Sequence, residues 1–375
     1  QDPIGDKINI RGIFTSEVPS LEQSVSTFVD GVNRGRGTQV RLPLLDLERV
    51  EVLRGPQGTL FGKNTVGGAL NLITRKPTPE FTSSLTAGYE FELEETSVAG
   101  VLSGPLSDAV RGRLAFSGRD QGEGFVDNRF YNESEPISQD ASVRAILDWD
   151  ATPTMLVRLR AEYQDFDVDG QPFALRSAGA LAPVIQTFGV SGGSLTRTAI
   201  GQTPGSPLEI GSSGTMTGDA HEAALTLEQT FASGAKLEIL GAFSALDFKR
   251  RLDADFSPLD LFGFDDTEDY SQRSLSLRFL SSDEGRARFV AGVYYQDIDL
   301  ELTGLSSQNN PVGAALLGGI CQTAGLSPAD AQQLAASAAT GRALDSVSQL
   351  ARAGSASVVN TCLMQLNCRI RRWWR

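Results

Sequence analysis

Two arginines near residue 35 have the type and spacing that most clearly suggest chemistry. Arg34 and Arg36 stand in the segment Asn33-Arg34-Gly35-Arg36-Gly37, which is rich in glycine and carries two positive charges. Guanidinium groups form paired hydrogen bonds with the oxygens of planar anions. The segment therefore suits an anionic ligand, and a solvated loop with no ligand is the alternative.

A run of aspartates offers a second and weaker chemistry. Asp165, Asp167 and Asp169 precede Gly170 with the spacing of the first half of a calcium loop. Arg176 stands where such a loop needs a glutamate with two liganding oxygens. We expect a solvated acidic rim and keep the three aspartates as a weak calcium candidate.

Enzyme chemistry finds little support in the sequence. One histidine and three cysteines are few for zinc sites or for Cys–His and Ser–His catalysis. Segment 58–64 has fewer residues between its glycines than a phosphate-binding loop, and it ends in Asn64 instead of Ser or Thr. We predict no enzyme activity, no catalytic residue, no resident metal and no cofactor.

The last part of the chain, 304–375, differs in texture from the rest. It is rich in Ala and Ser and ends in a basic tail, Arg369 to Arg375, which indicates a frameshift product or a cationic amphipathic segment. Cys321 and Cys362 bracket the Ala-rich stretch and could close a disulfide in an oxidising compartment. Pairing of Cys362 with Cys368 is the alternative.

Charge and hydropathy limit the partners of the chain. Its 375 residues hold 33 Lys and Arg against 46 Asp and Glu, a net charge of −13, which argues against nucleic acid as a partner. No window approaches the roughly 20 apolar residues of a membrane helix. The start at Gln1 has no signal-peptide features, so we expect a cytosolic protein or a mature or partial chain.

The middle of the chain alternates apolar and polar residues with the period of a strand. Short turns and long segments alternate between these runs, as they do at the two rims of an outer-membrane β-barrel. A soluble β-sandwich is the alternative. The pattern predicts nine strands, at about 81–91, 95–104, 109–119, 140–150, 154–165, 219–231, 235–248, 269–281 and 286–302.

The first 79 residues supply a family resemblance. Ile10-Arg11-Gly12, Phe28-Val29-Asp30-Gly31-Val32 and the run from Leu47 to Pro77, LERVEVLRGPQGTLFGKNTVGGALNLITRKP, closely resemble the plug domain of TonB-dependent outer-membrane receptors. The resemblance implies a mainly β protein, a transmembrane antiparallel barrel with a small α+β plug inside it. Within the run, we expect short strands at Val50–Leu53 and at Ala69–Ile73.

The resemblance also implies a domain division and an activity. Residues 1–79 would be part of the plug, 80–303 the N-terminal part of the barrel, and 304–375 a segment resembling an outer loop. The parent protein would import a scarce nutrient, most often a ferric siderophore, through the outer membrane of a Gram-negative bacterium. Its partners would be the TonB complex, outer-membrane lipid and lipopolysaccharide, and the small ligand.

Residue roles follow by position from the same resemblance. The arginines of the two Arg-Gly motifs, Arg11 and Arg54, would lock the plug to carboxylates of the barrel wall. Exposed arginines without a partner are the alternative, because exposed ion pairs contribute little. Ligand contacts would come from plug loops that face outward, which carry Asn33, Arg34, Arg36 and Gln39.

Nine strands are fewer than the 22 or so of a plugged outer-membrane transporter. Unpaired strand edges in lipid cost several kcal/mol per polar group. We therefore interpret the chain as a fragment that does not transport alone. The alternatives are a remnant of a broken gene and a soluble β-rich binding protein.

Overall fold

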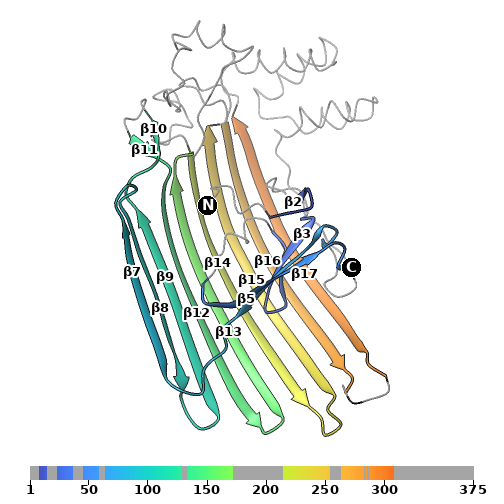
Figure 1. Ribbon diagram of the computed structural model, residues 1–375. Coiled ribbons are helices and arrows are strands. Elements are labelled where there is room, and N and C mark those ends of the chain that lie inside the picture. The colour runs from blue at the N-terminus through green and yellow to red at the C-terminus, as the bar shows by residue number, and fades with distance from the viewer. Residues whose placement is uncertain are drawn as a thin grey trace, which may run out of the picture.

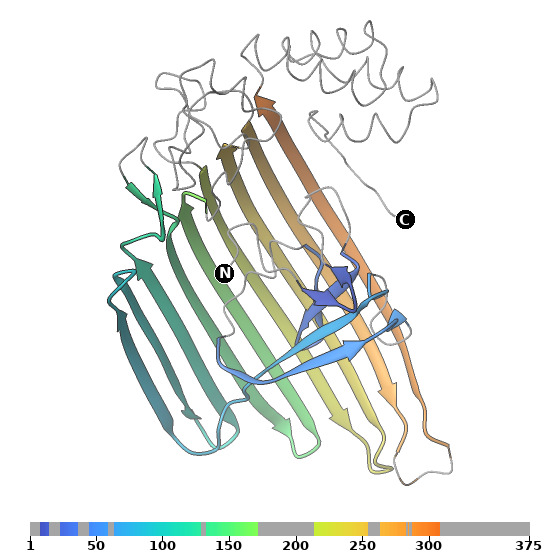
Figure 2. The same ribbon diagram turned by 45° about the horizontal axis from the view of Figure 1, so that its top comes forward.

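The computed structural model describes residues 8–14, 23–36, 45–58, 64–128, 133–171, 214–253, 263–282, 284 and 287–307. The elements in these ranges are strands, gathered in one sheet of nine strands, one of four and two of two. The four-stranded sheet lies across one face of the large sheet (Figures 1 and 2). No helix in the described part of the chain is long and apolar enough to cross a membrane.

The large sheet is an antiparallel meander in which each strand pairs with the next ones along the chain. This confirms the nine predicted strands. Their bounds are β7 Thr82–Glu90, β8 Glu95–Pro105, β9 Val110–Gln121, β12 Ile137–Thr152, β13 Met155–Asp169, β14 Gly214–Thr230, β15 Lys236–Asp253, β16 Gly263–Leu280 and β17 Val290–Ser307.

Several strands extend further into the long connecting segments than the alternation of apolar and polar residues predicts. β16 begins at Gly263 instead of near 269, and β15 continues to Asp253. These extensions carry charges that pair across strands: Arg251 Nε lies 3.2 Å from Asp265 Oδ2. Alternation of apolar and polar residues does not reveal such extensions, because both of their faces are hydrophilic. A further small hairpin, β10 Val126–Asn128 and β11 Glu133–Glu135, occupies part of the first long segment.

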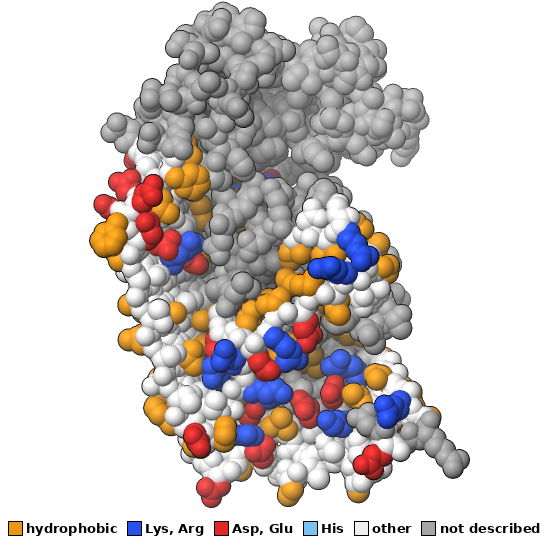
Figure 3. Space-filling model, in the orientation of Figure 1, with side chains coloured by type: hydrophobic (Ala, Val, Ile, Leu, Met, Phe, Trp, Pro, Cys, Tyr) orange, Lys and Arg blue, Asp and Glu red, His pale blue; other side chains and the backbone are white. Residues whose placement is uncertain are grey.

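The two faces of the large sheet differ in chemistry. Along β13, Leu159 and Tyr163 are 49% and 45% exposed, whereas Arg160 and Glu162 on the other face are 2% and 7% exposed. The first face is the apolar one expected on the exterior of a membrane barrel, and the second is the polar one expected to line the lumen. We call the second the lumen face. Charged side chains gather on the lumen face below the small sheet (Figure 3).

Gly100 on β8 provides a test of this strand register. It lies opposite Phe116 of β9, and a Cβ at Gly100 would stand 2.6 Å from Phe116 Cε1. We expect Gly100→Ala to destabilise the sheet by about 1–3 kcal/mol, because the ring must leave its position. Gly118→Ala is the matched control, since a Cβ at Gly118 would stand 3.7 Å from the nearest atom. Thermal unfolding of both variants measures the contrast, and equal melting temperatures would contradict the register.

The small sheet is the body of the plug. Its strands are β3 Val25–Val29, β4 Val32–Arg34, β5 Leu47–Arg54 and β6 Gly68–Thr74, in the order β4-β3-β6-β5. β3 and β6 run parallel, with Val29 and Leu72 buried between them. The two strands predicted within the Leu47–Pro77 run are confirmed as β5 and β6. A shorter pair, β1 Asn9–Ile10 and β2 Ile13–Phe14, precedes them.

Candidate functional site

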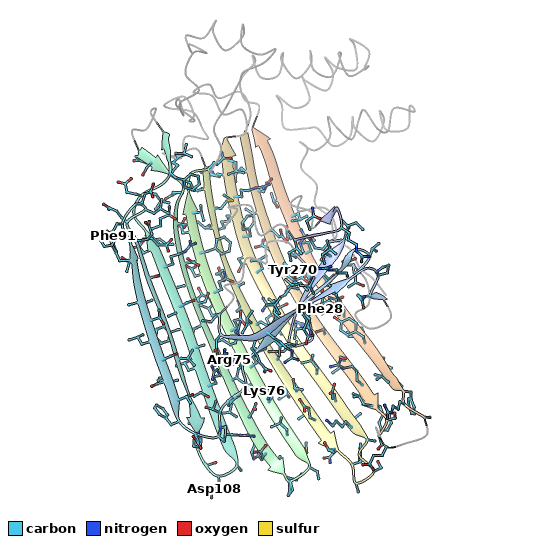
Figure 4. The ribbon with its side chains drawn as sticks, in the orientation of Figure 1. Phe28, Arg75, Lys76, Phe91, Asp108 and Tyr270 are labelled. Carbon is cyan, nitrogen blue, oxygen red and sulfur yellow. The ribbon has the colours of Figure 1, made fainter. Side chains whose placement is uncertain are left out.

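The contact between the plug and the lumen face of the wall concentrates the buried charges of the molecule. We call it the plug–wall interface. On the plug it comprises residues 29–36 and 45–46, and on the wall the lumen-facing side chains of β9 and β12–β16 that touch them. The plug sheet crosses the wall partway along the wall strands, near the labelled Phe28 and Tyr270 (Figure 4).

Its centre is a network of two glutamates and three arginines. Glu162 and Glu222 lie directly opposite each other on β13 and β14. Arg34 of the plug reaches both, with Nε 3.0 Å from Glu222 and Nη2 3.8 Å from Glu162. Two wall arginines add to the positive charge: Arg144 Nε lies 2.8 Å from Glu162, and Arg160 pairs with both glutamates. The two like charges can face each other in a buried site because these cations surround them.

The β3–β4 turn adds an acidic contact from the plug. Asp30 occupies this turn with φ +48°, and its carboxylate accepts hydrogen bonds from Thr74 N at 3.0 Å and Thr74 Oγ1 at 2.7 Å. Arg160 Nε lies 3.4 Å from the same carboxylate. Asp30 thereby links the turn, the end of β6 and the wall.

The residues after β4 press closely on β16. Arg36 pairs with Glu268, and both side chains are buried. Gln272 donates a hydrogen bond to the Asn33 carbonyl at 3.0 Å and accepts one from the Tyr270 hydroxyl at 2.6 Å. Tyr270 stands at the edge of the plug sheet (Figure 4). The Asn33–Arg36 segment is therefore part of the interface, not a free loop.

Gly35 fits this contact only because it has no side chain. A Cβ there would stand 2.8 Å from the Tyr270 hydroxyl oxygen, which is itself buried and hydrogen-bonded. We expect Gly35→Val to lift the Asn33–Arg36 segment from β16 and to make the plug cleavable by trypsin at urea concentrations at least about 1 M lower. Adding Tyr270→Phe to Gly35→Val removes the obstructing oxygen and should restore protection in part. Wild-type protection in Gly35→Val would contradict the contact.

A second anchor lies at the other end of the plug sheet. Asp46 precedes β5 and binds Arg113 of β9 through both oxygens, with Nε–Oδ2 2.5 Å and Nη2–Oδ1 2.6 Å. Both side chains are less than a tenth exposed. Arg144 also donates to the Leu45 carbonyl, so the chain is held to the wall just before β5 begins.

The lock predicted for Arg11 and Arg54 stays a prediction. Arg11 and Arg54 are exposed, and within the described residues neither makes an ion pair. Arg34 and Arg36, predicted as ligand contacts, pair with wall carboxylates instead. The sequence held a signal for this: Glu162, Glu222 and Glu268 fall on the lumen face of strands, where a charge needs a partner once a plug covers it.

The other predicted site residues divide into two groups. Gln39, Cys321 and Cys362 lie outside the described residues, as does the whole tail. Asp165, Asp167 and Asp169 lie along β13 and point to its outer face. Alternate residues of an extended strand stand roughly 6–7 Å apart and diverge from a common centre. The calcium-loop interpretation is therefore wrong for these three, and no group of metal-binding side chains was found among the described residues.

Comparison with known proteins identifies the plug. Residues 1–69 match the family model described as the TonB-dependent Receptor Plug Domain. The ferripyoverdine receptor of Pseudomonas aeruginosa is 34% identical over 131 residues, which are 33% of this chain and 14% of that receptor. The pesticin receptor of Yersinia pestis is 34% identical over 103 residues, 28% of this chain and 15% of that receptor. These matches span less than a fifth of the length of either receptor.

Solved structures resemble both the plug and the wall. The ferric yersiniabactin uptake receptor of Yersinia pestis superposes with a TM-score of 0.62 at 19% identity, over 82% of this chain and 44% of that one. The pyoverdine outer-membrane receptor of Pseudomonas aeruginosa gives 0.57 at 20% identity, over 76% and 40%. At sequence identities this low, the similarity shows a shared fold and nothing more. Residues 1–69 of this chain are therefore a TonB-dependent receptor plug domain, and the plug and wall together share the fold of the solved outer-membrane receptors.

Proposed function

We propose that the intact protein containing this chain imports a ferric siderophore, and that movement of the plug off the wall opens the way. Relatives of this chain are named as receptors for ferripyoverdine and for ferric enterobactin. Energy would come from the TonB complex, and the exposed apolar face of the wall would sit in outer-membrane lipid and lipopolysaccharide.

One observation carries the proposal: the central charges of the wall keep partners when the plug leaves. Glu222 retains Arg160, and Glu162 retains Arg144 and Arg160, after Arg34 is withdrawn. Leaving a buried charge without a partner costs about 3–5 kcal/mol. Pairing within the wall avoids this cost for the two central glutamates, whereas Glu268 and Arg113 lose their plug partners Arg36 and Asp46 when the plug leaves. The centre of the interface is therefore the part that separates at the lowest cost.

The proposal is tested in cells that lack their other TonB-dependent receptors. The intact receptor is expressed, and uptake of ⁵⁵Fe bound to pyoverdine, enterobactin or yersiniabactin is followed with and without a protonophore. We expect at least one chelate to accumulate about tenfold or more above empty cells, and the protonophore to abolish the difference. The chain 1–375 expressed alone is the control, and we expect no accumulation because edge strands β7 and β17 of its sheet stay unpaired. Absence of uptake for every chelate, with the receptor present in the outer membrane, would contradict the proposal.

A further inference from the structure

An apolar trough of about 460 Å³ crosses the outer face of the wall, over strands β8, β9, β12 and β13. Its floor consists of residues with little or no side chain, namely Gly104, Gly112, Ala145 and Ala161. Gly104 lies opposite Gly112 near the short turn that joins β8 to β9, and Ala145 lies opposite Ala161 in the middle of β12 and β13. The trough therefore leads obliquely from the short-turn rim toward the middle of the wall.

Large apolar side chains stand along both sides of this floor. Leu102 lies opposite Leu114 on one side, and Leu147 lies opposite Leu159 on the other. A hydrocarbon chain laid between them contacts the protein on three sides, whereas a chain on a flat wall contacts it on one. Within a membrane, lipid and protein are equally apolar, so the number of dispersion contacts decides whether a chain stays.

Phe81 and Leu106 flank the trough where it reaches the short-turn rim. A Cβ at Gly104 would stand 2.9 Å from Phe81 Cα, and a Cβ at Gly112 would stand 3.0 Å from Leu106 Cδ1. The two glycines thus allow these residues to lie close to the floor. Phe81 and Leu106 are 73% and 68% exposed, so the trough stays apolar down to the level of the turn.

The polar side chains of the lining are bound on the lumen face. The Arg113 guanidinium binds Asp46 of the plug, and the Ser103 hydroxyl accepts a hydrogen bond from the Thr78 backbone N–H at 2.9 Å. Among the described residues, Arg113 is the one charged residue that lines the trough. The trough therefore suits an uncharged hydrocarbon chain.

The turn beside the trough carries an exposed carboxylate. Asp108 lies two residues after Leu106, at the tip of the turn between β8 and β9 (Figure 4), and in the described part of the chain it makes no ion pair. Short turns of outer-membrane barrels face the periplasm. The leaflet on that side consists of phospholipids, and a headgroup amine complements the charge of Asp108.

We infer that the trough holds one acyl chain of a phospholipid of the periplasmic leaflet, with the headgroup amine beside Asp108. The inference goes beyond the proposed import function and shares with it the placement of the apolar face of the wall in lipid. The trough continues that lipid-facing surface, which is why the occupant is a lipid. An acyl chain of lipopolysaccharide and a second copy of this chain are the competing occupants.

The first test fills the trough. Ala161→Phe places a ring on its floor, and Ala223→Phe is the matched control, because Ala223 lies opposite Ala161 on the same face and does not line the trough. The intact receptor is purified in a mild detergent, and native mass spectrometry measures the phospholipid that it retains. We expect Ala223→Phe to retain as much as wild type, and Ala161→Phe at least about fivefold less. Equal retention by the two variants overturns the inference, as does a lipopolysaccharide or a second receptor in place of the phospholipid.

The second test leaves the trough unchanged and examines the headgroup. The delipidated receptor is offered equal amounts of dioleoyl phosphatidylethanolamine and dioleoyl phosphatidylglycerol. Wild type should retain the ethanolamine lipid at least about threefold more, and Asp108→Asn should retain the two lipids equally. Asp150→Asn is the control, since Asp150 is another exposed carboxylate near the short-turn rim and is paired with Arg111. Equal retention of the two lipids by wild type overturns the assignment of the amine to Asp108.

Lipid retention and import are measured separately, so their failures can be told apart. A receptor that imports no chelate but loses its phospholipid only in Ala161→Phe supports the trough and contradicts the import proposal. A receptor that imports a chelate but retains the same phospholipid in Ala161→Phe and Ala223→Phe contradicts the trough alone.

Discussion

Arg36→Ala is expected to weaken the seating of the plug by about 3–5 kcal/mol, whereas Arg34→Ala, two residues away, costs only about 1–2 kcal/mol. Both arginines are buried and both pair with wall glutamates. The two substitutions differ in whether the wall glutamate that remains still has a cation beside it. Within the described residues Arg36 is the one cation paired with Glu268, so its loss strands a buried carboxylate. Glu222 and Glu162 keep Arg160 and Arg144 when Arg34 is lost.

The measurement is a urea titration of the purified intact receptor, with trypsin cleavage of the plug as the readout of its release. The urea concentration at the midpoint, multiplied by the dependence of the free energy on urea concentration, gives the free energy of plug release in water. Arg36→Met combined with Glu268→Gln removes both charges and should recover most of the loss, because it leaves no buried charge unpaired. Equal midpoints for Arg36→Ala and Arg34→Ala would show that the wall arginines do not protect the central glutamates.

Asp46→Ala is the second change for which we expect a large effect, a loss of about 3–5 kcal/mol in the same titration. Arg113 binds Asp46 through two short hydrogen bonds and is buried, so removing the carboxylate leaves a guanidinium with no counter-ion among the described residues. Asp46→Ala with Arg113→Met should recover most of that loss, and the double-mutant cycle gives the coupling energy.

A matched control for this pair lies on the same strand. Arg111 of β9 also binds a carboxylate through two hydrogen bonds, those of Asp150 at 2.8 Å each, but its side chain is 29% exposed and that of Asp150 is 48% exposed. Asp150→Ala should cost no more than about 1 kcal/mol, because solvent screens an exposed pair. If Asp46→Ala is as mild as Asp150→Ala, the buried anchor at β9 contributes nothing to plug seating.

The wall could be predicted from the sequence because apolar and polar residues alternate in each of its strands. Apolar residues such as Leu159, Leu275 and Leu277 alternate with polar ones, so the period of two survives in every strand and the turns separate them. The ends of the strands could not be predicted so well. Beyond the apolar band both faces are hydrophilic, and the pairing of Arg251 with Asp265 depends on a neighbouring strand that one-dimensional periodicity does not see.

The interface was harder to predict, and for a physical reason. The segment Asn33–Gly37 looks like a free cationic loop in one dimension, because the sequence alone does not show which carboxylates meet its two arginines. Its partners are about 130 to 230 residues away along the chain, as in Arg34 with Glu162 and Arg36 with Glu268. The resemblance directed attention to Arg11 and Arg54 and assigned Arg34 and Arg36 to the ligand, so it gave no sign of these two long-range pairs.

The most direct test of plug release during import is to link the plug covalently to the wall and then to cut the link. Asn33→Cys and Gln272→Cys place thiols at a direct contact, where the Gln272 side-chain nitrogen lies 3.0 Å from the Asn33 backbone carbonyl oxygen. A short, reducible bis-thiosulfonate links them in the intact receptor with its native cysteines replaced by Ser. Linked receptors should bind the ⁵⁵Fe chelate but import it at less than about a tenth of the wild-type rate, and reduction should restore import. Each single-cysteine variant, treated alike, should import normally. Import at the wild-type rate by fully linked receptor would contradict release of the plug from this wall during import.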